Sequence, residues 1–230
     1  RWYVNALGDE FQFTLAGSSW QTIKIDYDRS ILYVDEATHS VPPNWMSDSS
    51  FFSHELSQEV LTILTSEENY NFLNPAELSV LSIYREELEM TGLKMNTMLI
   101  DGRKDGFLII TYAGNRVNYT IANAIQTQFN YFDITSLTWK GFKLKCEDRD
   151  LLPALEKVID AIKLITKKEF YNDENKNELI ELVPDISFSK YQKYLPTHMR
   201  KEQSAEYVYD IDTTLSYLGD VEILGYKDLI

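Results

Sequence analysis

Three polar side chains, Asn115, Arg116 and Asn118, follow directly after a strand-like segment and a glycine. Residues 107–112 form an apolar run rich in β-branched and aromatic side chains, which indicates a strand. A strand that turns on a glycine into a helix leaves unpaired backbone N–H groups at the helix start, where an anion is stabilised. These side chains could therefore hold a phosphate or a nucleotide edge. The alternative is structural: Asn115 caps the helix and Arg116 is solvated.

Cations and aromatic rings surround this segment in the same part of the chain. The cations Arg103, Lys104, Arg116, Lys140, Lys143 and Lys145 outnumber the acids Asp101, Asp105 and Asp133. Aromatic side chains, Trp139 among them, lie between these cations, and stacking of a base on such a ring contributes about 1–3 kcal/mol. In the other interpretation the rings belong to the core and the lysines are solvated. The residues predicted to contact nucleic acid are Arg116, Asn115, Asn118, Lys140, Lys143 and Trp139.

Two motifs point to enzymes but lack essential parts. Residues 34–38, Val-Asp-Glu-Ala-Thr, look like the magnesium-binding box of a helicase ATPase, yet the chain has no Gly-Lys-Ser or Gly-Lys-Thr phosphate loop. His54-Glu55 begins a helix as in a zinc protease, but position 58 is Gln where the second His is needed. The sequence therefore predicts no catalytic residue, no metal and no cofactor in this segment.

Composition indicates a globular chain inside the cell. The 230 residues are 44% hydrophobic and 13% aromatic, which is ample for a core. The formal charge of −14 argues against nucleic-acid binding by the whole surface, although a local basic face is compatible with it. A single cysteine, Cys146, excludes an internal disulfide and suits a reducing compartment. Because there is no signal peptide and no apolar run long enough for a membrane, the expected location is cytoplasmic.

The pattern of elements predicts an α+β protein in four segments. Residues 1–50 indicate a small β-barrel-like sheet of short strands, and residues 51–93 a helical hairpin. Residues 94–166 indicate a mixed sheet with helices on one side, ending in an amphipathic helix over 151–165. Residues 167–230 are expected to form a charged C-terminal tail with short helices. Since the chain begins at Arg1 directly in hydrophobic sequence, we expect it to be cut or processed from a longer protein.

Short strings spread in order over most of the chain carry a resemblance to a known family. They are Gly8-Asp9-Glu10-Phe11, Leu15-Ala16-Gly17, Trp20-Gln21-Thr22-Ile23, Val34, Pro43-Asn44-Trp45, residues 53–60, residues 112–120 and residues 189–196. The ordered set resembles the C-terminal region of Lhr-type superfamily 2 helicases, with its β-barrel and its DEAD/DEAH-associated α/β domain.

The resemblance implies an accessory module of an ATP-dependent helicase. In that family the ATPase motor and a winged helix precede this region, so ATP and Mg²⁺ would be bound upstream. The implied partners are those motor domains and single-stranded nucleic acid, DNA more than RNA, with no membrane. The implied setting is DNA repair or antiphage defence.

Two other functions remain open from the residues alone. The acidic surface and the charged tail favour a protein–protein docking module that binds a basic partner without touching nucleic acid. A free-standing hydrolase would need paired acid and base residues, and the scattered Asp, Glu and His residues show no such spacing.

Overall fold

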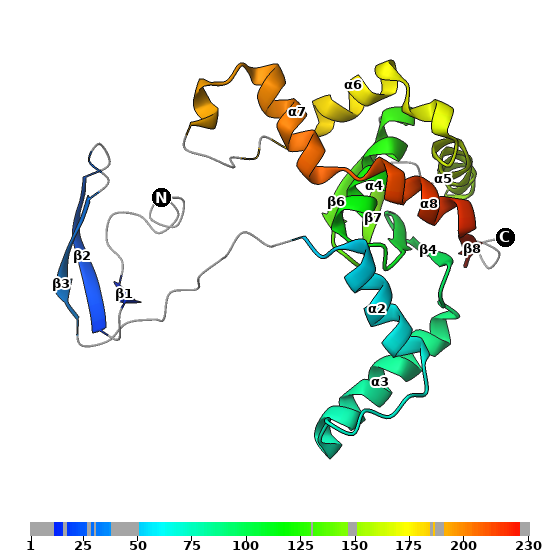
Figure 1. The fold of residues 1–230 in the computed structure, drawn as a ribbon, viewed down its shortest axis with the longest axis horizontal. Helices are drawn as coiled ribbons and strands as arrows, with labels where there is room; N and C mark the ends of the chain where they lie inside the picture. The colour runs from blue at the N-terminus through cyan, green and yellow to red at the C-terminus, as the bar shows by residue number, and fades with distance from the viewer. Residues whose placement is uncertain are drawn as a thin grey trace. The chain divides into compact units, whose positions relative to one another are not determined.

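A computed structural model of the protein describes residues 12–15, 18–26, 29, 31–37, 51–129, 131–146, 151–184, 186 and 191–225. These residues belong to two compact units, Arg1–Ser50 and Phe51–Ile230 (Figure 1). The expected strings at 8–11, 43–45 and 189–190 lie outside the described residues. Helices and strands are both present, as expected for the α+β class.

The described part of the first unit is an open three-stranded antiparallel sheet in the order β1-β2-β3. Its strands are β1 (Gln12–Leu15), β2 (Ser18–Asp26) and β3 (Ile31–Glu36). Closing a barrel requires pairing of the outer strands, and here β1 and β3 each pair with β2 alone among the described residues. The three described strands therefore form a sheet that does not close into a barrel. Asp35 and Glu36, from the segment that looks like a magnesium-binding box, are exposed at the end of β3.

The second unit begins with the helical hairpin that the sequence predicts. Helix α2 (His54–Thr65) starts after Ser53, whose Oγ accepts a hydrogen bond from the Leu56 N–H. Helix α3 (Pro75–Thr91) has a capping box between Asn74 and Glu77 and ends at Gly92 in the left-handed conformation. In Figure 1 the start of α3 points away from the sheet of its own unit.

A five-stranded sheet in the order β6-β7-β5-β4-β8 forms the centre of the second unit. Neighbouring strands are antiparallel except β4 and β8, which are parallel. The strands are β4 (Thr97–Arg103), β5 (Gly106–Ile110), β6 (Phe132–Leu137), β7 (Gly141–Cys146) and β8 (Glu222–Leu224).

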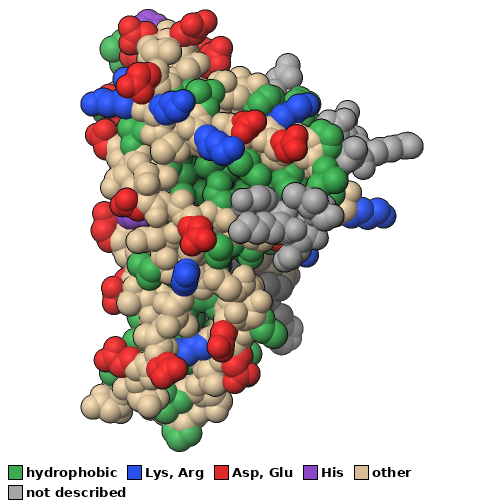
Figure 2. Space-filling model, turned by 90° about the vertical axis from the view of Figure 1, so that its right-hand side faces the viewer, with side chains coloured by type: hydrophobic (Ala, Val, Ile, Leu, Met, Phe, Trp, Pro, Cys, Tyr) green, Lys and Arg blue, Asp and Glu red, His purple; other side chains and the backbone are tan. Residues whose placement is uncertain are grey.

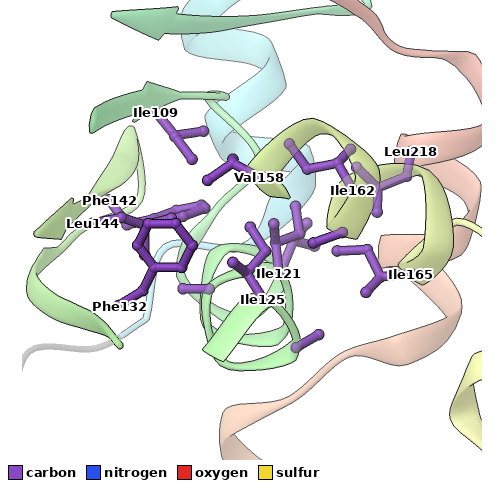
Figure 3. Packing of buried hydrophobic residues seen from close by; sticks show 14 of the residues in the cluster. Ile109, Ile121, Ile125, Phe132, Phe142, Leu144, Val158, Ile162, Ile165 and Leu218 are labelled. Carbon is purple, nitrogen blue, oxygen red and sulfur yellow. The ribbon is translucent and has the colours of Figure 1, made fainter. Parts of the chain in front are cut away.

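Helices α4 (Asn115–Gln128) and α5 (Leu151–Ile165) cover one face of this sheet. Figure 3 shows Ile121 and Ile125 of α4 between the strand side chains Phe132 and Phe142 and the α5 residue Ile162. All of these side chains are at most 2% exposed. Burial of an aliphatic side chain stabilises by about 1.5–3 kcal/mol, so this layer holds the unit together.

The segment after residue 166 is part of the same core and supplies a strand, although its composition suggested a separate charged tail. Leu179, Val208 and Leu218 are buried in the main cluster. The elements are η1 (Lys168–Tyr171), α6 (Asp173–Leu182), η2 (Gln192–Tyr194), α7 (Thr197–Val208), α8 (Ile211–Asp220) and β8. Among the described residues, no helix is long and apolar enough to cross a membrane.

The other face of the sheet is covered at one end by the hairpin. Leu61 and Leu88 of the hairpin are buried together with Tyr112, and Leu99 and Ile110 of the sheet pack against them. Next to this contact, α3 and the sheet border a groove of about 400 Å³. Its lining includes Tyr84, Leu88, Leu108, Ile110 and Lys140.

Candidate nucleic-acid interface

The connection from β5 into α4 is built on two residues with positive φ. Tyr112 has φ 50° and Gly114 has φ 86°. A Cβ at Gly114 would lie 2.8 Å from the His54 nitrogen and 2.9 Å from the Phe52 carbonyl oxygen. Only glycine combines this backbone conformation with such a close approach. The lead into α2 therefore packs directly on the start of α4.

This packing closes the helix start where the sequence suggested an anion. The Asn115 N–H donates to the Phe52 carbonyl oxygen at 3.0 Å, so a backbone oxygen occupies the place of the expected phosphate. The Phe52 N–H donates in turn to Asn115 Oδ1 at 2.9 Å. Helix α4 has Gly114 as its N-cap and no side-chain capping bond, so Asn115 does not cap it. Asn115 instead holds Phe52 in place.

Arg116 binds the C-terminal end of helix α7. Its guanidinium donates to the carbonyl oxygens of Glu206, at 2.9 Å, and of Tyr209. It also lies 3.9 Å from the Asp210 carboxylate. A cation at the end of a helix satisfies unpaired carbonyl groups and interacts favourably with the helix dipole. The side chain is 41% exposed, but its Nη2 donors are already used within the protein.

Asn118 is fully buried and connects α4 to the turn between β6 and β7. Its Oδ1 accepts from the Thr111 hydroxyl at 2.6 Å, and its Nδ2 donates to the carbonyl oxygens of Thr138 at 2.8 Å and Trp139 at 3.2 Å. A buried amide with these partners orders the backbone around it. Asn118 therefore acts as a positioning residue for Trp139.

Asn115 and Asn118 order the backbone at one end of the sheet, and four side chains meet there. We call this group the aromatic corner; it consists of Phe52, Tyr112, Trp139 and Lys140. Phe52 and Trp139 stack with ring centroids 5.1 Å apart and an interplanar angle of 15°. Tyr112 meets Trp139 edge to face at 5.5 Å. The Lys140 ammonium lies 5.2 Å from the centre of the Trp139 ring, within the range of a cation–π interaction.

Exposure differs across the aromatic corner. Tyr112 is buried, and burial raises the pKa of its hydroxyl above the ordinary value. Trp139 is half-buried, whereas Phe52 is 37% exposed and Lys140 is exposed. The corner thus presents an aromatic surface and an ammonium group together to solvent.

Lys143 lies on β7, toward the other end of the sheet. It pairs with Asp105 of the β4–β5 turn at 3.0 Å. The hydrogen bond from Lys143 is the main cause that lowers the pKa of the Asp105 carboxyl. Arg103 is likewise paired with Asp101 at 2.5 Å. Exposed pairs of this kind contribute little stability, but they reduce the positive charge that the sequence suggested for this strip.

The electrostatic field around the sheet is mixed. On the face drawn in Figure 2, Asp and Glu side chains are spread from end to end and Lys and Arg side chains lie among them. With a formal charge of −14 for the whole chain, any contact with nucleic acid has to be local. In the described part of the chain, no three His, Cys, Asp or Glu side chains are grouped to hold a metal ion.

Of the six residues predicted from sequence, Trp139 and Lys140 lie together, with Asn115 and Asn118 supporting their surroundings. Arg116 and Lys143 lie apart from this corner in other contacts. Phe52 was not predicted from the sequence. It lies far from Trp139 along the chain, and no local pattern indicates that the two rings stack.

Comparison with protein-family models, curated proteins and solved structures finds no match for this chain.

Proposed function

We propose that this chain is a non-catalytic accessory module of an ATP-dependent helicase, and that it contacts the single strand along which the motor moves. Two arguments support the proposal. One is the ordered set of sequence strings that resembles the C-terminal region of Lhr-type helicases. The other is the aromatic corner, whose exposed ring and ammonium are the two groups that single-strand binding requires.

The aromatic corner is the observation that carries the proposal. A base can stack on the exposed face of Phe52, because Trp139 supports this ring from behind. The Lys140 ammonium then lies near the strand's phosphates, a contact that positions a strand without reading its sequence. A hydrogen-bonded backbone behind the rings keeps the surface ordered before binding.

The roles of the predicted residues follow from their contacts. Phe52, Trp139 and Lys140 contact the strand. Asn115 and Asn118 position these groups from below. In this proposal ATP and Mg²⁺ are bound by a motor elsewhere in the protein. DNA is favoured over RNA as the bound strand.

Fluorescence anisotropy with a labelled oligothymidine tests the proposal. We expect weak binding that falls as salt rises from about 50 mM to about 200 mM, because a small number of phosphate contacts is lost. Phe52→Ala and Lys140→Ala should each weaken binding about threefold to tenfold. The matched controls are Phe72→Ala and Lys176→Ala, which remove an exposed ring and an exposed cation elsewhere. Equal effects of the test and control variants, or binding indifferent to salt, would contradict the proposal.

A docking module without nucleic-acid contact is the second candidate. The groove between α3 and the sheet favours it, because its lining is largely apolar and continues into exposed side chains of α3. Val80 and Ile83 are 51% and 55% exposed on this helix. Exposed apolar patches of this kind mark protein interaction sites.

Two variants separate the candidates. If the first candidate is correct, the unaltered chain binds the oligonucleotide and Lys140→Glu should abolish this binding. If the second is correct, neither the unaltered chain nor Lys140→Glu should bind it. Ile83→Glu should weaken binding to a separately expressed helicase motor, measured by calorimetry, only if the hairpin docks there. A full loss of oligonucleotide binding in Lys140→Glu with no effect of Ile83→Glu excludes the docking function for this face.

A further inference from the structure

Strand β6 is an outer strand of the five-stranded sheet, and its second edge has no partner strand among the described residues. An edge strand presents backbone N–H and C=O groups that can pair with another extended chain. The register of β6 with β7 contains an irregularity between Ile134 and Ser136. Bulges of this kind bend an edge strand and change the direction of its free groups.

A groove of about 580 Å³ runs along this edge. The residues 133–137 of β6 all line it, whereas a groove on one face of the sheet would take only every second residue. Helix α4 forms another wall with Tyr119, Asn123 and Gln126, which lie on one side of the helix. Leu182 and Pro184, at the end of α6, complete the lining.

The hydrogen bonds of Phe132 show which backbone groups face the groove. Its N–H donates to the Phe129 carbonyl oxygen at 3.2 Å, and its own carbonyl oxygen accepts from Gln126 Nε2 at 3.1 Å. Both groups of Phe132 therefore point away from β7. In an antiparallel ladder this direction repeats at every second residue, so the N–H and C=O of Ile134 point the same way. These two groups are the pairing sites for an incoming strand.

Charge restricts the kind of chain that fits. Of the described residues that line the groove, only Asp133 is charged, and the whole chain carries a formal charge of −14. A second copy of this chain would bring the same negative charge to the edge, which disfavours pairing between copies. A cationic peptide is attracted both to Asp133 and to the protein as a whole.

We propose that the groove beside β6 binds an extended, cationic peptide segment of a partner protein as an additional strand of the sheet. The peptide backbone pairs with Ile134, and its basic side chains face Asp133. Alternate side chains point the other way and contact Leu182 and Pro184, which favours aliphatic residues at those positions. This binding mode is separate from the aromatic corner and does not depend on contact with nucleic acid.

A fluorescent synthetic peptide of alternating valine and arginine is the probe. N-methylation removes a backbone donor without changing the side chains, so a scan along the peptide should alternate in effect. Methylation at every second position should weaken binding about tenfold, and methylation at the positions between should change it less than about twofold. Equal loss at all positions, or no binding of the parent peptide, would overturn the proposal.

A protein variant tests the charge. Asp133→Asn should weaken peptide binding about threefold to tenfold, while the matched variant Glu156→Gln on exposed α5 surface should not. Hydrogen exchange of the Ile134 amide should slow when the peptide is added. Unchanged exchange at Ile134 together with tight peptide binding would place the peptide elsewhere and refute strand addition.

Discussion

Asn115 and Phe52 exchange two hydrogen bonds across the junction of α2 and α4. The Asn115 N–H donates to the Phe52 carbonyl oxygen at 3.0 Å, and the Phe52 N–H donates to Asn115 Oδ1 at 2.9 Å. A residue that looks like a ligand-binding group in the sequence thus positions an aromatic ring that the sequence did not single out. The same junction holds the Gln58 amide, which donates to the Tyr112 carbonyl oxygen at 2.8 Å.

Two substitutions at Asn115 test whether the hydrogen bond accepted by its Oδ1 stabilises the fold. Asn115→Ala should lower the free energy of unfolding by about 0.5–1.5 kcal/mol, because the Phe52 N–H loses its partner. Asn115→Asp keeps an acceptor at the same place and adds a negative charge at a helix start, so it should retain full stability. Urea unfolding measures both. If Asn115→Asp is as unstable as Asn115→Ala, the Oδ1 bond is not what matters.

Asn118→Ala should be the more damaging change. It leaves the partly buried carbonyl groups of Thr138 and Trp139 and the buried Thr111 hydroxyl with fewer partners, which should cost about 2–4 kcal/mol. Asn177→Ala, on the exposed side of α6, is the control and should change stability by less than about 0.5 kcal/mol. A loss below about 1 kcal/mol for Asn118→Ala would refute its positioning role.

Gly114→Ala should prevent the normal junction from forming. The added Cβ meets the backbone of Ser53 and His54 at 2.8 Å and the residue keeps φ at +86°, so we expect a loss of about 3 kcal/mol or more. Gly219→Ala in α8 has open space around its Cβ and should stabilise by up to about 1 kcal/mol. Thermal unfolding of the two variants should move in opposite directions.

Arg116→Gln tests whether this side chain stabilises the end of α7 or binds the nucleic-acid strand. Loss of the two carbonyl contacts should speed hydrogen exchange at the end of α7 and cost about 1 kcal/mol, a modest value because the guanidinium is partly exposed. Oligonucleotide affinity should fall less than in Lys140→Ala. A larger fall in affinity with unchanged exchange in α7 would assign Arg116 to the strand instead.

Alkaline pH should unfold the second unit through its buried tyrosines. Burial is the main cause that raises the pKa of Tyr209 and Tyr217 well above the ordinary value of 10. Since the folded-state pKa is the higher one, the neutral form stabilises the fold fully below about pH 10, and this stability is lost as the pH rises further. Urea midpoints measured between pH 8 and pH 11 (roughly the range that spans the unfolded-state pKa) should be flat at first and then fall. A midpoint that rises above pH 10 would contradict this.

Tyr209→Phe adds a local check. Its hydroxyl donates to the Leu179 carbonyl oxygen at 2.8 Å and accepts from Asn123 Nδ2 at 2.9 Å, all in the buried core. Removing it should cost about 1–3 kcal/mol at neutral pH and should make the alkaline fall in stability smaller. Equal alkaline slopes in both proteins would place the titration at other residues.

Elements with strong local signals could be read from the chain alone. The Asn74-Pro75 start and the Gly92 end of α3 are where the sequence indicates them, because capping and left-handed residues act within a few positions. Helix α5 was predicted over its observed range, since its apolar spacing follows one helix face. In contrast, the predicted strand over 107–112 ends at Ile110, because Tyr112 turns to positive φ.

Packing between segments far apart in the chain determines the elements and contacts that have no strong local signal. Helix α7 and strand β8 carry weak local signals, and they form because the sheet and α4 offer them apolar surface and an unpaired edge. The candidate site was only partly visible for the same reason. Trp139 and Lys140 are neighbours in the sequence, so their proximity could be predicted. Three other features depend on segments that are far apart in the chain: the contact of Trp139 with Phe52, the burial of Asn118 and the binding of Arg116 to the end of α7. Side-chain chemistry is local to the sequence, but the partner of each side chain is set by the fold.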